Sequence, residues 1–426
     1  MKLRESLQKI TKAPLYRNSF TLVSGTFIAQ LFLLVISPIL TMLYSPEEFG
    51  VYGAFLSVST ILAMIGTGRY ELAILLPKKD KDGYYIFLLS LLLAAFFGVL
   101  LLLIIFLTQS FYFWDWVTAL RGNYLFLIPP GVFLFSMTMP AAFLANRFKK
   151  FRLLSFSKIA GSGSTGLLGL LFGSVGITFG GLIFSKLIGW LVETGVIVVP
   201  ILKKATNAFK PFEKSRLFKQ AKKYQNFPKF SIPEGLLNTG FKQIPILALT
   251  MFFSPELAGF FTLTSSILAK PFGMVSMSFG HVFFQKATEV DHPDKLRPIF
   301  SELLRFLFLL AIVPTALLFI FAPSVFSWVF GQVWATSGIY ARWMLPFFFV
   351  TYLKSPFSGM VDVKNAFVRN LFFEVGFVGI ALAAFAIGHW QKDDLLAIKI
   401  FSLGNGVLGL IQLYWFKLLI EEEGGW

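Results

Sequence analysis

Two stripes of polar residues cross apolar segments in the second half of the chain, and each stripe ends in a lysine. Their members recur every four residues: Glu234, Asn238 and Lys242 in the first stripe, and Thr262, Ser266 and Lys270 in the second. This spacing places each stripe on one face of a helix. A charge near the centre of a bilayer costs at least about 2.5–3.5 kcal/mol, so a lysine there faces a partner or a hydrated cavity. We interpret Lys242 and Lys270 as cavity-lining cations that attract an anionic substrate, with a buried structural ion pair as the alternative. Asn238 and Ser266, one turn before the lysines, are further candidate ligands.

Arg69 is a candidate of a different kind, in the sequence Gly66-Thr67-Gly68-Arg69-Tyr70-Glu71. Its guanidinium group could bind a phosphate through two parallel hydrogen bonds. Snorkelling of the side chain toward the membrane surface is the alternative. Arg69 and Glu71 are two residues apart, so they point to opposite sides of a regular helix. We therefore expect one of them to face the cavity and the other to pack, or to unwind the turn locally.

Other charges in the apolar segments are candidates for ion coupling or for structural ion pairs: Glu71, Glu234, Lys186 and Glu193. Lys186 and Glu193 share a helix face but are two turns apart, so each needs a further partner. The remaining basic residues in apolar segments are Lys158, Arg305, Arg342 and Lys399. Because these lie within about two turns of a segment end, we interpret them as side chains that extend to the membrane interface.

Several kinds of chemistry are missing from the sequence. The chain has no cysteine, which excludes disulfides, thiolate metal sites and a cysteine nucleophile. The histidines His281, His292 and His389 are scattered without metal-ligand spacing. Two G-x-G-x-x-G matches, at 161–166 and 404–409, lie inside apolar segments, where they predict close helix packing rather than nucleotide binding. We expect no catalytic residues, no metal and no cofactor, and therefore no enzyme.

The elements that must position these residues are twelve apolar segments long enough to cross a bilayer as helices. They lie near residues 19–43, 49–76, 84–107, 124–145, 153–172, 177–200, 230–252, 257–283, 298–321, 339–354, 370–388 and 395–416. The mean hydropathy of +0.72 and the 56% hydrophobic residues agree with this pattern. A soluble protein of this composition would expose far more apolar surface than soluble proteins tolerate. The sequence predicts an all-α polytopic membrane protein.

Positive charge is concentrated in every second connection between these segments. Of 38 Lys and Arg residues, 28 fall on one side and only Arg121 and Lys392 on the other. By the positive-inside rule the basic side is cytoplasmic, and both termini are on that side. The net charge of +16 therefore indicates contact with anionic membrane lipids rather than nucleic acid.

A basic linker divides the chain into two halves of six segments each. We expect an N-terminal lobe at 1–200, a linker at 201–229 with nine basic residues and one acid, and a C-terminal lobe at 230–426. The turn Tyr44–Tyr52 recurs 209 residues later as Phe253–Phe261, with Ser-Pro-Glu helix-start chemistry in both copies. Both copies follow the first segment of their half, which predicts a pseudo-twofold axis along the membrane normal and alternating access. A channel would more often show a short filter sequence.

The chain resembles the bacterial polysaccharide-biosynthesis flippases, which are the O-antigen repeat-unit translocases of the multidrug/oligosaccharidyl-lipid/polysaccharide exporter superfamily. The resemblance covers nearly the whole chain, and its motifs are the Leu43–Gly50 turn, Arg69–Ala73 with Pro77–Lys79, and Phe330–Trp334. It implies an inner-membrane protein that moves an undecaprenyl-diphosphate-linked oligosaccharide to the periplasmic leaflet, for lipopolysaccharide or related glycans, with a central cationic cavity between two lobes. It also implies contact with membrane lipids, a polysaccharide polymerase and other assembly proteins. The family has no fixed catalytic residues.

Two other functions compete with this interpretation. A multidrug or small-molecule antiporter of the same superfamily would be expected to present acids in its cavity, whereas the mid-segment charges of the second half are lysines. A membrane glycosyltransferase or polymerase usually needs a large outer loop with acids or Arg, and the longest outer connections here have about 17 residues with one acid, Asp115. An anionic substrate therefore fits the charge pattern best, and the resemblance implies that this substrate is lipid-linked.

Overall fold

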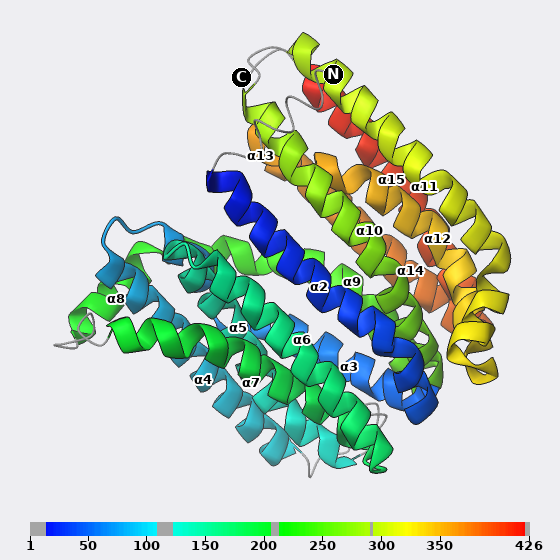
Figure 1. Ribbon diagram of the computed structural model, residues 1–426, viewed down its shortest axis with the longest axis horizontal. Helices are drawn as coiled ribbons and strands as arrows, with labels where there is room; N and C mark the ends of the chain where they lie inside the picture. The colour runs from blue at the N-terminus through cyan, green and yellow to red at the C-terminus, as the bar shows by residue number, and fades with distance from the viewer. Residues whose placement is uncertain (1–13, 109–121, 206–212, 290–292, 422–426) are drawn as a thin grey trace. The chain divides into compact units, whose positions relative to one another are not determined.

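The computed structural model describes residues 14–108, 122–205, 213–289 and 293–421, and within these ranges every regular element is a helix (Figure 1). Twelve helices of 20 to 38 residues match the predicted segments: α2 (Pro14–Leu43), α3 (Pro46–Gly66), α4 (Asp80–Thr108), α5 (Ile128–Arg147), α6 (Phe151–Ser174), α7 (Thr178–Ala205), α9 (Ile232–Phe252), α10 (Pro255–Glu289), α11 (Pro293–Phe330), α12 (Ala335–Lys354), α14 (Phe367–Gln391) and α15 (Asp394–Glu421). The all-α prediction is confirmed. Arg121, Asp115, His292 and most of the basic N-terminus lie outside the described residues.

Short helical elements connect the long ones. They are the 3₁₀ helices η1 (Tyr70–Leu75), η4 (Gly122–Leu127), η6 (Gln332–Trp334) and η7 (Ser355–Phe357), the α-helices α8 (Lys214–Lys223) and α13 (Met360–Val363), and the π-helix η5 (Phe227–Ser231). Of these, η1, α8 and η5 lie beside the charged residues that the sequence singles out. They therefore matter most for the candidate site.

Nine of the long helices in the described residues are apolar enough to be membrane spans by length and composition alone. The other three are α6, α9 and α12, which carry Lys158, Lys242 and Lys354 respectively. A lysine in a long membrane helix is stable only beside a polar partner or water. The least apolar long helices are thus where a polar site is to be sought.

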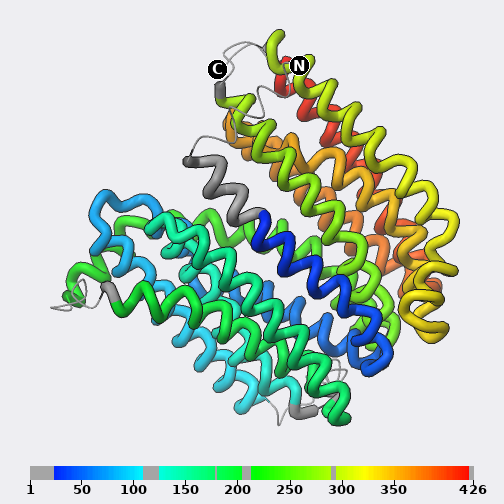
Figure 2. Tube along the Cα trace, viewed as in Figure 1, coloured from blue at the N-terminus to red at the C-terminus, as the bar shows by residue number. Residues whose placement is uncertain are grey.

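The described residues form two compact units. Unit 1 contains residues 14–44 and 55–236, and unit 2 contains residues 45–54 and 237–421. In unit 1, α6 packs against both α2 and α7, which the trace in Figure 2 shows as neighbours. In unit 2, α15 packs against both α12 and α14. The first turns of α3 belong to unit 2, so this helix is shared.

The two G-x-G-x-x-G segments serve close helix packing, as predicted. A methyl group on Gly166 of α6 would lie 2.4 Å from the Ile36 side chain of α2. In α15, a methyl group on Gly404 would lie 2.8 Å from Ile380, and one on Gly409 the same distance from Val350. Both segments lie within helices and neither follows a strand, so neither has the context of a nucleotide-binding loop.

The two copies of the Ser-Pro-Glu turn begin helices, as the sequence predicts. Ser45 and Glu48 form a capping box at the start of α3, in which the Ser45 amide donates to the Glu48 carboxylate over 2.7 Å and the Glu48 amide donates to the Ser45 hydroxyl over 3.3 Å. At the start of α10, the amide of Leu257 donates to the Ser254 hydroxyl over 3.2 Å. These caps fix where both helices start.

The repeated turns also contact one another within unit 2. A methyl group on Gly50 would lie 1.7 Å from the carbonyl oxygen of Pro255, and one on Gly259 would lie 1.7 Å from that of Pro46. Both pairs are equivalent under the 209-residue repeat, so the contact is reciprocal. Only glycine allows the backbones of α3 and α10 to approach this closely.

The second predicted segment is too long. Its helix, α3, ends at Gly66 rather than continuing to Leu76, because Gly68 and Arg69 adopt left-handed backbone conformations with φ of 61° and 59°. The chain then continues as the 3₁₀ helix η1. Of the two alternatives that the sequence left open, packing or local unwinding, the structure shows unwinding around Arg69, at a cost of about 1–2 kcal/mol for the left-handed arginine.

Candidate anion-binding clusters

The first predicted stripe lies along α9, where Glu234, in the first turn that belongs to unit 1, and Asn238 and Lys242, in unit 2, are all exposed. The ammonium group of Lys242 donates to the side-chain oxygen of Asn238 over 2.9 Å. Lipid is an unfavourable environment for an exposed ammonium group in the middle of a long helix. We therefore interpret this part of α9 as a hydrated surface.

Lys354 is a second lysine of unit 2 and is held by side chains of two other helices. Its ammonium nitrogen lies 2.5 Å from the side-chain oxygen of Gln412 on α15 and 3.9 Å from the ring centroid of Phe377 on α14. The Gln412 amide in turn donates to the side-chain oxygen of Asn370 over 2.9 Å. Gly409, one turn before Gln412, lies beside the lysine stem, since a methyl group there would lie 3.8 Å from its Cδ.

Glu374 of α14 connects these two lysines electrostatically. Its charge stabilises the ammonium groups of both Lys242 and Lys354, which repel one another. One carboxylate and two ammonium groups leave a formal excess of one positive charge. With the amides of Asn238 and Gln412, this cluster offers charge and hydrogen-bond donors suited to an anionic, sugar-bearing ligand.

Sequence reasoning missed most of this cluster. It counted Lys354 among the residues of a connection, whereas the side chain is half-buried and hydrogen-bonded between α12, α14 and α15. Glu374 was one of several acids noted inside the predicted segments, but Asn370 and Gln412 were not candidates. The available signal was the low hydropathy of α12, but hydropathy does not identify the partner of a lysine on another helix.

Unit 1 contains a similar group of two lysines and one glutamate. Lys158 of α6 forms an ion pair of 2.5 Å with Glu193 of α7, while Lys186 lies 5.2 Å from the ring centroid of Trp190. Lys186 also interacts electrostatically with Glu193 and Lys158. Lys158 is therefore paired with Glu193, and its location at the membrane interface stays a prediction.

The local packing explains why this ion pair forms. A methyl group on Gly161 of α6 would lie 2.8 Å from Cβ of Glu193, so the glycine lets α7 come close enough for the carboxylate to reach Lys158. This group, like the unit 2 cluster, has a formal excess of one positive charge. Lys186 and Glu193 thus share a cluster, as the face they share suggests, but Lys158 makes the direct contact.

The Arg69 turn is the third charged feature. The guanidinium nitrogen Nη1 of Arg69 lies 3.6 Å from Oε1 of Glu71, which is fully buried. A methyl group on Gly235, in the first turn of α9, would lie 3.4 Å from the guanidinium carbon of Arg69. Glu71 lies outside the candidate spans, and burial raises its pKa, although the Thr67 hydroxyl and the charge of Arg69 act in the opposite direction.

Hydrogen bonds of two side chains, Arg147 and Tyr70, hold this turn in place. Arg147, at the end of α5, donates to the carbonyl oxygens of Ile74 and Pro77 over 2.8 Å each and also binds the Asp80 carboxylate. The Tyr70 hydroxyl donates to the carbonyl oxygen of Ala221 in α8 over 3.0 Å. The strained Arg69 conformation is therefore held by its surroundings.

The second predicted stripe is only partly accessible. Thr262 is buried, donates to the carbonyl oxygen of Ala258 over 2.7 Å and packs against Gly53 of α3. Ser266 and Lys270 follow it on α10 and are half-buried. A cavity-lining role therefore remains a prediction for Ser266 and Lys270, and Thr262 has a packing role.

Arg342 has a structural explanation. Pro323 interrupts the hydrogen bonding of α11, and Arg342 of α12 donates to the carbonyl oxygens of Phe319 and Ile320 over 2.9 Å each. Phe319 precedes Pro323 by four residues, so its carbonyl lacks the usual helical donor. The arginine replaces that donor.

The sequence matches a family model described as "Polysaccharide biosynthesis protein" over residues 39–338, which is more than two thirds of the chain. The chain belongs to this family. The resemblance found from the sequence motifs is thereby confirmed. No curated protein sequence matches the chain.

Solved transporter structures share the fold of this family member. An inward-facing multidrug resistance MATE family transporter of the MOP superfamily is similar with a TM-score of 0.69 and 16% identity, over 94% of this chain and 93% of that one. A MOP superfamily transporter from Pyrococcus furiosus, whose structure is described as showing reverse polarity of the binding pocket, is similar with a TM-score of 0.55 and 15% identity, over 95% of both chains. The polysaccharide biosynthesis protein thus has the two-lobed helical fold of MOP transporters.

Proposed function

We propose that the protein is a flippase for an undecaprenyl-diphosphate-linked oligosaccharide, which it moves from the cytoplasmic to the periplasmic leaflet of the bacterial inner membrane by alternating access. The observation that carries this proposal is the Lys242–Lys354–Glu374 cluster, with its excess positive charge among amide groups. A diphosphate is an anion that such a cluster can bind, and the amides can bind sugar hydroxyls. The substrate's lipid tail would stay in the bilayer.

The family and the fold support the same proposal. A polysaccharide biosynthesis protein with the fold of a transporter is suited to moving a glycan intermediate rather than building it. The Pyrococcus furiosus transporter is described as having a pocket of reverse polarity that suggests a different function, which links pocket charge to substrate. Positive clusters in both units favour an anionic substrate over the organic cations of a multidrug antiporter. We further propose that an ion gradient drives the cycle.

The test of this function is depletion of the protein in its host, followed by analysis of the lipid-linked glycan. We expect the completed repeat unit to accumulate in the cytoplasmic leaflet, because synthesis continues while translocation stops. The assigned cluster would be supported if the resupplied wild-type protein restores export and a variant with neutral residues at Lys242 and Lys354 does not. Accumulation of an unfinished oligosaccharide would show instead that the protein is an enzyme of assembly.

The proposed orientation predicts which positions an impermeant thiol reagent can reach. Because the natural chain has no cysteine, single variants report one position each. In intact cells with a permeable outer layer, Ser45→Cys and Gln332→Cys should react, whereas Lys79→Cys and Ser215→Cys should react only after lysis. All four side chains are exposed in the structure, so a lack of reaction reflects sidedness. The inverse pattern would reverse the orientation.

A further inference from the structure

The helix α8 (Lys214–Lys223) lies in the linker of unit 1 and has two different faces. Five of its ten residues are basic and none is acidic. One face is already covered: Leu217 and Ala221 pack against the hydrophobic core of unit 1, and Gln220 is buried. The apolar side of this amphipathic helix therefore needs no further partner.

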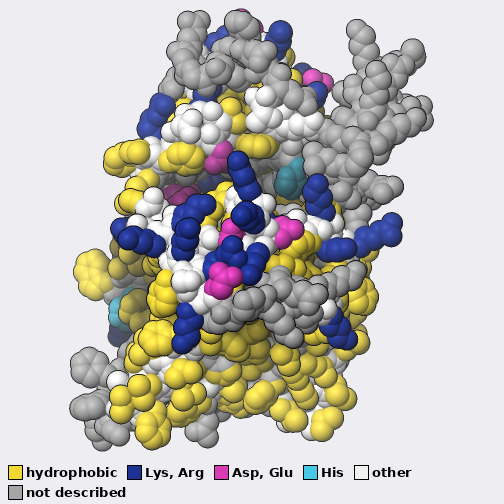
Figure 3. Space-filling view, turned by 90° about the vertical axis from the view of Figure 1, so that its left-hand side faces the viewer, with side chains coloured by type: hydrophobic (Ala, Val, Ile, Leu, Met, Phe, Trp, Pro, Cys, Tyr) yellow, Lys and Arg dark blue, Asp and Glu magenta, His cyan; other side chains and the backbone are white. Residues whose placement is uncertain are grey.

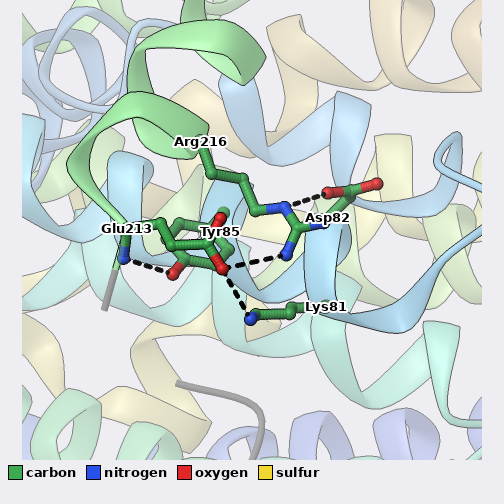
Figure 4. Close-up of polar contacts among 5 residues, drawn as sticks. All are labelled: Lys81, Asp82, Tyr85, Glu213 and Arg216. Carbon is green, nitrogen blue, oxygen red and sulfur yellow. Dashed lines mark hydrogen bonds and ion pairs between the residues drawn. The ribbon is translucent and has the colours of Figure 1, made fainter. Parts of the chain in front are cut away.

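Polar contacts fix the rotation of α8 about its own axis, as Figure 4 shows. Glu213, just before the helix, accepts a hydrogen bond of 2.9 Å from Lys81, and its amide donates to the Tyr85 hydroxyl over 2.8 Å. Arg216 lies 3.2 Å from the carboxylate of Asp82. The hydrogen bond from Lys81 lowers the pKa of Glu213, so this anchor stays ionised at neutral pH.

The opposite face of α8 is exposed and combines an aromatic ring with lysines. Its residues are Lys214, Ser215, Phe218, Lys219, Lys222 and Lys223. The Phe218 side chain is 71% exposed, and Phe230, beside Lys229 just beyond the helix, is exposed to the same extent. Within the described residues, none of the lysines of this face forms an ion pair with an acid. These exposed phenylalanines are therefore apolar surface that the fold of the unit leaves uncovered.

The position of α8 accounts for this composition. The helix packs against α4 and contacts its first residues, Lys81 and Asp82, where a candidate membrane span begins. The end of a membrane-spanning helix lies near the membrane surface, so we expect α8 to lie near that surface. Figure 3 shows that positive side chains gather on the face of the molecule that carries α8. Basic residues around an aromatic ring at this depth are typical of helices that lie on anionic membranes.

We propose that the exposed face of α8 is a binding surface for the headgroups of anionic phospholipids, with Phe218 inserted at the level of the headgroups and the lysines around it contacting phosphate groups. The inference does not depend on which substrate the protein carries. Because the Tyr70 hydroxyl binds Ala221, lipid bound to α8 would also hold the turn that contains Arg69. The surface would thus connect the linker to the charged interior of unit 1.

The test uses the full-length protein with a spin label at Phe218→Cys, reconstituted into phosphatidylcholine vesicles with or without phosphatidylglycerol. Collision with oxygen reports a lipid environment, and collision with a water-soluble nickel chelate reports an aqueous one. Phe106→Cys, exposed on α4, and Lys79→Cys, exposed at its start, provide the membrane and aqueous reference values. We expect the label at 218 to match the membrane reference only when phosphatidylglycerol is present, and to lose this match at high salt.

Charge variants separate lipid binding from simple burial. In the labelled protein, Gln at the four lysines of the exposed face should return the label to the aqueous value, since each lysine near an anionic surface strengthens binding about fivefold. The matched control replaces the same number of exposed lysines elsewhere, at 149, 150, 295 and 417, and should leave the label unchanged. An aqueous label in both vesicle types would overturn the proposal. So would protection that is independent of lipid charge, or protection that appears only when soluble protein or nucleic acid is added.

Discussion

Replacing Gly50 with alanine is expected to lower the thermal unfolding midpoint sharply and to reduce the yield of folded protein. The new methyl group would lie 1.7 Å from the carbonyl oxygen of Pro255, so α3 and α10 would have to separate. Overpacking of a core costs about 1–3 kcal/mol when side chains can adjust. Here the obstacle is backbone, so we expect a cost at or above the upper end of that range.

Two further variants make the Gly50 result specific. Gly259→Ala should have a similar effect, because Gly259 makes the reciprocal contact with Pro46. Gly273 lies in the same helix, α10, 14 residues after Gly259. A methyl group on Gly273 would have no neighbouring atom within 4 Å, so Gly273→Ala should be neutral or stabilising by up to about 1 kcal/mol. The measurement is the unfolding midpoint of the purified protein in detergent. Equal midpoints for the Gly50 and Gly273 variants would show that the repeat contact has no structural role.

Neutralising both lysines of the unit 2 cluster is expected to reduce glycan export more than any other change in that cluster. Lys242→Gln with Lys354→Gln leaves Glu374 as an uncompensated negative charge, which repels a diphosphate. At an effective dielectric constant of about 20, a unit charge at about 8 Å contributes roughly 2 kcal/mol, or about thirtyfold. We therefore expect about a thirtyfold loss for one lysine and about a thousandfold loss for both.

A charge series distinguishes electrostatics from packing at this cluster. Adding Glu374→Gln to the double variant restores a neutral cluster, so export should recover toward the level of a single lysine variant. Arg at both lysine positions should retain most activity because the charge is preserved. Export by proteoliposomes, normalised to the amount of protein, is the measurement. If the double and triple variants are equally impaired, the lysines act through packing and not through charge.

The sequence alone determined the helical class, the number of long helices, the helix starts at the Ser-Pro-Glu turns and the packing role of the glycine-rich segments. These features depend on local information: the length of an apolar stretch fixes a span, a serine side chain caps its own helix, and a glycine removes its own side chain. The sequence also offered local unwinding around Arg69 and Glu71 as one of two alternatives. The end of the second predicted helix was placed too late in the sequence. The left-handed residues end α3, but the residues of η1 that follow are also apolar, so hydropathy does not mark this end.

Only the tertiary structure decided which charges meet. Lys354 and Gln412 are 58 residues apart, and Lys158 and Glu193 are 35 residues apart on different helices. Which side chain a lysine reaches depends on how each helix is rotated about its axis and on how closely the neighbouring helix approaches. Successive side chains are about 100° apart around a helix, so a small change in rotation changes the partner. Polar stripes identify a face of one helix, but the partner of that face is set by packing among several helices. For that reason Lys242 could be found from its stripe, whereas the role of Lys354 became visible only once α9, α12, α14 and α15 were assembled.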